Sequence, residues 1–103
     1  MSFNHWGYEF AGPFFIPDNL PEAEGIYVVF CKPAVGNFSV VDVGQAEDVK
    51  ERLTNHDRED CWRRSCRGTL YYAVHQMLFS TEDERRAVEM HIRSQTNPPC
   101  GER

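Results

Sequence analysis

The sequence predicts one small α/β domain of the α+β type, with a three-stranded, mostly antiparallel sheet flanked by helices. Three observations lead to this fold class. A chain of 103 residues has room for one hydrophobic core only. Runs of β-branched and aromatic residues at 26–31, 38–43 and 69–74 have the length and composition of strands. Apolar residues at helical spacing follow the second and the third of these runs.

The first two runs are expected to form an antiparallel hairpin. Residues 26–31 are apolar throughout, which is typical of a strand that is buried on both faces. Residues 34–37 form a short turn sequence before the second run, so the two strands are expected to pair directly. The alternation of side chains along the second strand predicts a shared face made of Phe38, Val40 and Asp42.

Two helices are expected in the second half of the chain. The first covers about 46–55, where alanine, valine and leucine recur at helical spacing. Residues 57–68 are polar and rich in arginine, and they are expected to form either a loop or a further short helix. Thr81 with Glu84 has the pattern of a capping box, which predicts a helix from there to about Gln95.

The N-terminal residues 1–24 differ from the rest of the chain. They hold six aromatic side chains, interrupted by glycines and prolines. Because so much aromatic surface would be costly to leave in water, the segment is expected to pack on the domain of residues 25–103. We expect an irregular arm there, with at most one short strand.

Charge is unevenly distributed over the sequence. The net charge of −5 argues against strong nonspecific binding of a polyanion, since lysine and arginine supply most of that affinity. Residues 50–67 nevertheless carry six cations against four anions. They form either the contact to a phosphate backbone or a solvated mixed-charge loop. The candidate substrate-binding residues are Lys50, Arg58, Arg63, Arg64 and Arg67.

The four cysteines, Cys31, Cys61, Cys66 and Cys100, contain no CxxC pair. They are expected to be reduced thiols of a cytoplasmic protein. The alternative is that Cys61 and Cys66 form half of a metal site. No apolar run reaches the length of a membrane span, and no basic segment followed by an apolar one begins the chain, so a soluble cytoplasmic protein is expected.

Several short motifs follow one another in an order that resembles the GIY-YIG nuclease superfamily. Gly25-Ile26-Tyr27 matches the GIY triplet, and Asp42-Val43-Gly44 stands where the family has YIG. Arg52-Leu53, followed by His56, is similar to the end of the family's first helix. Glu89 lies on the last helix, ahead of two prolines. The resemblance covers roughly residues 25–101 and departs from the family at Asp42, where a tyrosine is expected.

The resemblance implies a catalytic site for hydrolysis of DNA phosphodiester bonds. Tyr27 would be the general base, Arg52 would hold the phosphate, His56 would assist proton transfer, and Glu89 would bind Mg²⁺ or Mn²⁺. Asp42 is then either a second ligand of that metal or a sign that catalysis was lost. In the second case the domain is a binding module whose acidic surface faces a protein.

Each candidate residue also has an ordinary structural explanation. Tyr27 could be a core residue, and Glu89 could pair with arginines one turn away on its own helix. Arg52 lies four residues after Asp48, which is the spacing of a surface ion pair. A domain this small and acidic is expected to bind DNA weakly by itself. It would therefore need a homodimer or a protein partner for affinity and target choice.

Overall fold

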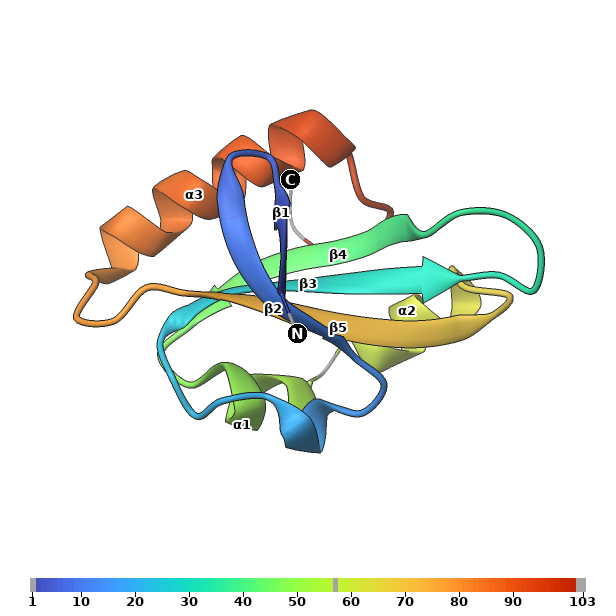
Figure 1. Cartoon of the computed structure of the whole chain (residues 1–103), viewed down its shortest axis with the longest axis horizontal. Helices are drawn as coiled ribbons and strands as arrows, with labels where there is room; N and C mark the ends of the chain where they lie inside the picture. Colours follow the sequence, from blue (N-terminus) through green and yellow to red (C-terminus); the bar gives the residue numbers. More distant parts are fainter. Residues whose placement is uncertain (1, 57, 102–103) are drawn as a thin grey trace.

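The sheet has five antiparallel strands in the computed structural model, which describes residues 2–56 and 58–101. Their spatial order is β1-β2-β5-β3-β4, so β3 lies inside the sheet and β4 forms one edge (Figure 1). The predicted sheet of three strands is therefore wrong in its size, although the three expected strands are present. The strands are β1 (Ser2–His5), β2 (Tyr8–Phe14), β3 (Gly25–Lys32), β4 (Ser39–Ala46) and β5 (Thr69–Gln76).

The two additional strands come from the N-terminal segment, which was expected to be largely irregular. Trp6 and Gly7 turn the chain with φ angles of 54° and 87°, and β2 returns along β1 as a hairpin. Phe3 and Phe10 face each other across this hairpin with their rings stacked at 5.5 Å. β2 then pairs with β5, where Phe14 lies opposite Tyr72. The aromatic side chains thus enter the core through regular strand pairing.

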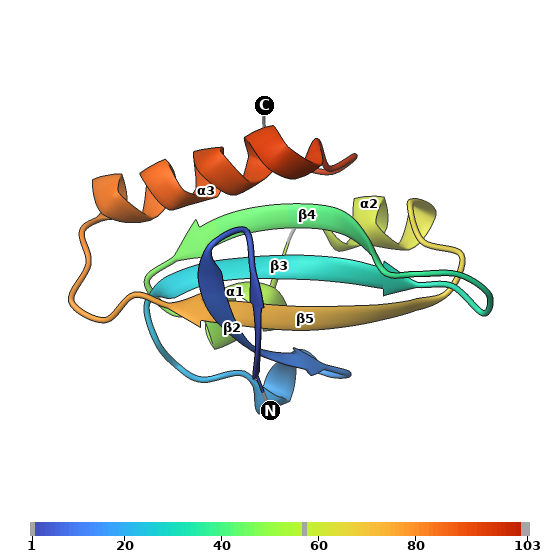
Figure 2. The same ribbon diagram turned by 45° about the horizontal axis from the view of Figure 1, so that its top comes forward.

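Helices cover both faces of the sheet. The 3₁₀ turn η1 (Pro17–Asn19) and α1 (Val49–Thr54) lie on one face, and α3 (Glu82–Thr96) lies on the other (Figure 2). The arginine-rich segment forms α2 (Glu59–Arg64), which is one of the two expected alternatives. The capping box that opens α3 is confirmed, since the side chains and backbone of its two residues bond reciprocally.

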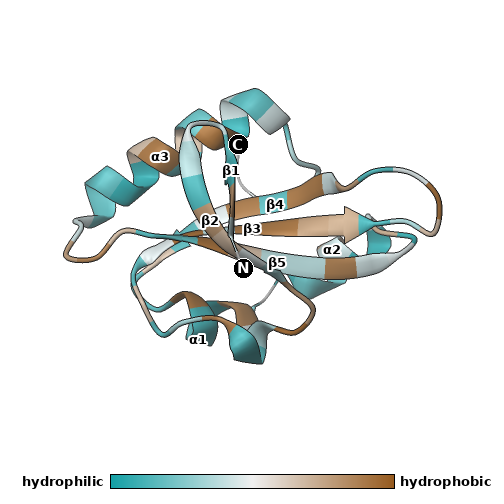
Figure 3. Cartoon of the chain, in the orientation of Figure 1, coloured by the Kyte–Doolittle hydropathy of each residue, from teal (hydrophilic) through white to brown (hydrophobic). Residues whose placement is uncertain are grey.

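Two apolar clusters fill the space between the sheet and these helices. On the side of α3 the buried members are Phe10, Ile26, Val28, Phe30, Val43, Ala73 and Ile92. On the opposite side the cluster includes Tyr27, Val29, Val41, Val49, Leu53, Trp62 and Tyr72. Alternate residues of β3 therefore serve the two cores, which explains its apolar sequence. Hydrophilic and hydrophobic residues alternate along α1 and α3 (Figure 3).

The face predicted for β4 is wrong because the strand contains an irregularity. Val29 pairs with Asp42 whereas Phe30 pairs with Val40, so Val41 has no partner of its own in the register. An extra residue of this kind shifts the following side chains to the other face. Val40 consequently packs on the side of α3, while Asp42 lies with Val29 on the opposite side.

All four cysteines form disulfides, which corrects the expectation of reduced thiols. Cys31 is bonded to Cys66 and Cys61 to Cys100. The partners lie 35 and 39 residues apart, so the spacing of neighbouring cysteines gave no sign of the pairing. Disulfides are typical of oxidising compartments, which runs against the cytoplasmic expectation. Among the described helices none has both the length and the apolar character that a membrane crossing requires.

Candidate functional site

The carboxylate of Asp42 is the centre of a buried polar cluster at the β4 edge of the sheet. One oxygen, Oδ2, accepts hydrogen bonds from Arg58 Nε at 2.9 Å and from Trp62 Nε1 at 2.8 Å. The other, Oδ1, accepts from the backbone nitrogen of Val43 and from Arg93 Nη2, each at 2.8 Å. The side chain is fully buried. Four N–H groups therefore surround this charge and compensate for its removal from water.

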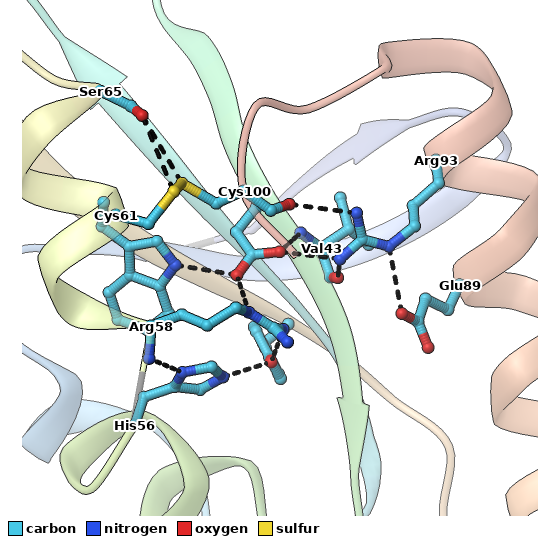
Figure 4. Close-up of polar contacts among 11 residues, drawn as sticks. Val43, His56, Arg58, Cys61, Ser65, Glu89, Arg93 and Cys100 are labelled. Carbon is cyan, nitrogen blue, oxygen red and sulfur yellow. Dashed lines mark hydrogen bonds and ion pairs between the residues drawn. A yellow bond between two sulfur atoms is a disulfide. The ribbon is translucent and has the colours of Figure 1, made fainter. Parts of the chain in front are cut away.

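The two arginines reach Asp42 from different layers of the fold. Arg58 precedes α2, and Arg93 extends from α3 around the β4 edge (Figure 4). Arg93 also donates to the carbonyl oxygens of Val43 and of Cys100, the latter at 3.2 Å. The backbone nitrogen of Cys100 in turn donates to Val41 at 3.1 Å. Asp42 thus joins both helical layers and the C-terminal segment to one strand.

The phenol of Tyr27 contacts the same cluster through its oxygen. His56 Nε2 lies 2.7 Å from this oxygen, and Arg58 Nη2 donates to it at 3.1 Å. The Nδ1 atom of His56 accepts from the backbone nitrogen of Arg58 at 2.9 Å. A neutral imidazole then carries its proton on Nε2, an assignment that follows from the hydrogen bonds. The phenol oxygen of Tyr27 is consequently an acceptor toward both neighbours.

Gly44 makes room for the ring of Tyr27. The two residues are opposite each other in the pairing of β3 with β4. A Cβ atom at position 44 would stand 2.2 Å from two atoms of the phenol. The glycine that ends the Asp-Val-Gly triplet therefore has a direct steric purpose. The absence of a side chain at Gly44 leaves room for the ring of Tyr27, whose oxygen contacts His56 after the end of α1.

Burial controls the protonation of Tyr27. It raises the pKa of the phenol above its ordinary value, because the charged form would lose its hydration. Arg58 opposes this rise in pKa, the charge of Asp42 adds to it, and Arg52 lowers the pKa as well. The net direction is upward, so the phenol is protonated at neutral pH. A base there would need a pKa shifted in the opposite direction.

The structure brings together three of the four residues expected to be catalytic. Tyr27 and His56 are in contact, and Arg52 acts electrostatically on Tyr27 from its exposed position on α1. Glu89 projects from α3 toward Arg93 and pairs with it at 3.1 Å (Figure 4). It is linked to the other three through Arg93 and Asp42, and not by direct contact.

The two carboxylates expected to bind a metal do not form one site. Both oxygens of Asp42 are occupied by N–H donors, and Glu89 is paired with Arg93. A divalent ion such as Mg²⁺ requires free oxygen ligands arranged around one point. In the described part of the chain, no three His, Cys, Asp or Glu side chains gather in this way. The residues as placed do not fit the metal that the resemblance implies.

The five candidate phosphate contacts have different surroundings. Lys50 lies 3.8 Å from Glu22, and Arg63 pairs with Glu59 at 2.8 Å on the surface of α2. Arg58 belongs to the buried cluster. Arg64 and Arg67 are exposed. The predicted basic segment therefore does not present all of its cations to solvent as one patch.

The sequence did not identify Trp62 and Arg93 as members of the cluster. Trp62 lies in a polar, arginine-rich segment, and Arg93 lies one turn from Glu89 on the same helix, where an ordinary surface ion pair explains it. A buried aspartate on a strand requires donors, which was the available signal for both residues.

Searches with protein-family models, curated protein sequences and solved structures find no significant match to this chain.

Proposed function

We propose that the domain is a protein-interaction module with a GIY-YIG-like fold, whose polar cluster stabilises the fold without performing catalysis. One observation carries the proposal. Asp42 stands where the family has its second tyrosine, and it holds Arg58 against the oxygen of Tyr27. The residue that departs from the family, Asp42, thus forms an ion pair with Arg58. Arg58 is the cation that contacts the oxygen of Tyr27, the expected general base.

The surroundings of Tyr27 support the loss of catalysis. Its side chain is fully buried, and its oxygen already accepts from His56 and Arg58. A general base must reach the attacking water and must lose its proton near neutral pH. Burial raises the pKa of Tyr27, which keeps the proton on the phenol. Neither requirement is met in this arrangement.

The charge of the domain supports a protein partner over a nucleic acid. The net charge is −5, and several cations of the basic segment are engaged with carboxylates. Binding to a phosphate backbone depends on many cations that are free to replace counterions. A net-negative domain of this kind is suited to a protein partner that presents a local positive surface.

A plasmid cleavage assay tests the proposal. Purified protein is incubated with supercoiled plasmid and Mg²⁺ or Mn²⁺, alongside the variants Arg52→Ala and Glu89→Ala. We expect no cleavage above that of buffer for any of the three proteins. Cleavage by the wild type that is lost in both variants would contradict the proposal. Cleavage that persists in both variants would indicate a contaminating nuclease, and repurification would then remove it.

A metal-dependent endonuclease is the second candidate function. It is favoured by the 2.7 Å contact of Tyr27 with His56 and by the electrostatic effect of Arg52 on the same phenol. This function would require Arg93 to release Glu89 and Arg58 to leave Tyr27. The same plasmid assay distinguishes the two candidates, because only the endonuclease predicts cleavage that depends on Arg52 and Glu89.

A further inference from the structure

The loop between β5 and α3 presents two large apolar side chains to solvent. Leu78 is 59% exposed and Phe79 is 93% exposed. The backbone of Phe79 is left-handed, with φ 61°, a conformation that is unfavourable for a bulky residue. Its nitrogen donates to Glu24 Oε2 at 3.1 Å, and the nitrogen of Ser80 donates to Met77 at 3.2 Å. The loop is therefore held in a strained shape that exposes a phenyl ring, which is typical of binding sites.

Acidic residues lie at the same end of the sheet as this apolar pair. The starts of β3 and α3 and the end of β4 meet at the same end of the sheet (Figure 1). The loop itself is hydrophobic and the first turn of α3 is hydrophilic (Figure 3). The carboxylates at this end are those of Glu24, Glu47, Glu82, Asp83 and Glu84, of which Glu82 is paired with Arg86 at 2.7 Å.

The other end of β5 offers a hollow and positively charged side chains, where the first end offers an exposed apolar pair and carboxylates. A hollow of about 480 Å³ is lined there by side chains that include Phe15, Ile16, Leu70, Tyr72 and Arg63. Phe15 and Ile16 remain 65% and 44% exposed. The hollow thus combines apolar side chains with the guanidinium of Arg63, which is also paired with Glu59 at 2.8 Å, and two further exposed cations follow nearby in the chain, Arg64 and Arg67.

We propose that the exposed Leu78–Phe79 pair of one molecule binds the Arg63-lined hollow of a second copy of this chain. The inference rests on the proposed function as an interaction module. The phenyl ring would lie against the Arg63 guanidinium, an arrangement that is favourable for an aromatic face and a cation. The carboxylates beside the loop would face Arg64 and Arg67, so the charges of the two surfaces are complementary.

Geometry determines the form of this association. The two surfaces lie at opposite ends of β5, whose eight residues span roughly 26 Å. The loop of one molecule therefore cannot reach its own hollow. The contact joins different surfaces of the two copies, and such heterologous contacts extend head to tail. Because few side chains anchor the contact and both copies are net negative, the association is weak and depends on concentration.

Sedimentation equilibrium of the whole chain tests the proposal. The weight-average mass of the wild type is expected to rise with protein concentration. Phe79→Ser removes the inserted ring, while Arg63→Glu and Ile16→Asp each disrupt the hollow. For each variant alone, the dissociation constant of self-association is expected to rise by roughly tenfold or more, as is usual for the loss of a central aromatic or arginine anchor.

Mixing the variants provides the decisive measurement. Phe79→Ser has an intact hollow and Arg63→Glu has an intact loop, so their equimolar mixture is expected to form a one-to-one dimer and nothing larger. Met90→Ser is the matched control, because Met90 is also apolar and 69% exposed but lies on α3. This control is expected to associate like the wild type. Circular dichroism and thermal melting confirm that every variant is folded.

Three results would overturn the proposal. The wild type could remain monomeric at millimolar concentration, Phe79→Ser could associate as strongly as the wild type, or the mixture of variants could stay monomeric. None of them affects the plasmid assay. A monomeric protein that does not cleave plasmid would therefore refute self-association while the proposed function still held, whereas metal-dependent cleavage would contradict the function itself.

Discussion

The ring of Tyr27 lies across Gly44, in the space that the side chain of any other residue would occupy. The two residues belong to neighbouring strands and are directly opposite in the β3–β4 register. Each ends one of the two triplets that resemble the GIY-YIG pattern. The glycine is therefore required by the position of the phenol, since Gly44 lies inside β4 and its backbone has no positive φ angle.

Substitution Gly44→Ala is expected to destabilise the domain. The added methyl group would stand 2.2 Å from the phenol, so the ring has to move away from His56. Overpacking of this kind costs about 1–3 kcal/mol, which urea denaturation measures. In a Tyr27→Val background the same substitution is expected to cost less, because space has been created. Equal costs in the two backgrounds would show that the ring is not the obstacle.

Substitution Asp42→Asn is expected to cost about 3–5 kcal/mol of unfolding free energy, since it leaves Arg58 and Arg93 partly buried without their shared counter-charge. Glu82→Gln is the matched control. Its partner Arg86 lies 2.7 Å away, but both side chains are more than half exposed, so the loss is at most about 1 kcal/mol. Similar midpoints for the two variants in urea would contradict a central role of Asp42.

Stability is expected to fall at alkaline pH. Burial raises the pKa of Tyr27 and of Tyr72, so the native state retains protons that the unfolded chain releases above about pH 10. The unfolded state then binds fewer protons than the native state, and the unfolding free energy decreases as pH rises through this range. Melting temperatures between pH 8 and 11 measure the decrease. Tyr27→Phe should reduce it, and an unchanged pH profile in this variant would exclude Tyr27 as a cause.

Protein purified without reductant is expected to show no reactive thiol after denaturation, and four after reduction. The double variant Cys61→Ser/Cys100→Ser should lose about 4 kcal/mol of stability, the value for a loop of this length. Thiol titration and urea denaturation are the two measurements. Four reactive thiols in the unreduced protein would support the cytoplasmic expectation instead.

The parts of the fold that could be predicted are those with a clear local pattern. The apolar run that forms β3 and the capping box of α3 are both encoded within a few residues. The β1–β2 hairpin was missed because Trp6-Gly7 is not a usual hairpin turn sequence, and because glycine and proline interrupt β2. The irregularity in β4 has no local signal that alternation alone can detect.

The candidate site was predictable to the extent that motif order reflects position in space. The resemblance implies that Tyr27 and His56 share one site, and their side chains are in contact although the residues are 29 positions apart. It could not indicate that Asp42 would be surrounded by donors, because these come from α2 and α3 and depend on how the helices pack. The two disulfides also join distant segments, and four cysteines allow three pairings that the sequence does not distinguish.

The pairing of the cysteines has a topological consequence for the integrity of the molecule. The two closed loops interleave, because Cys61 lies within the first and Cys66 within the second. Any single peptide bond hydrolysed between Cys31 and Cys100 therefore leaves both pieces covalently connected. A protease that cuts once at the exposed Phe79 would produce a nicked protein of undiminished size, and its two fragments would separate only after reduction.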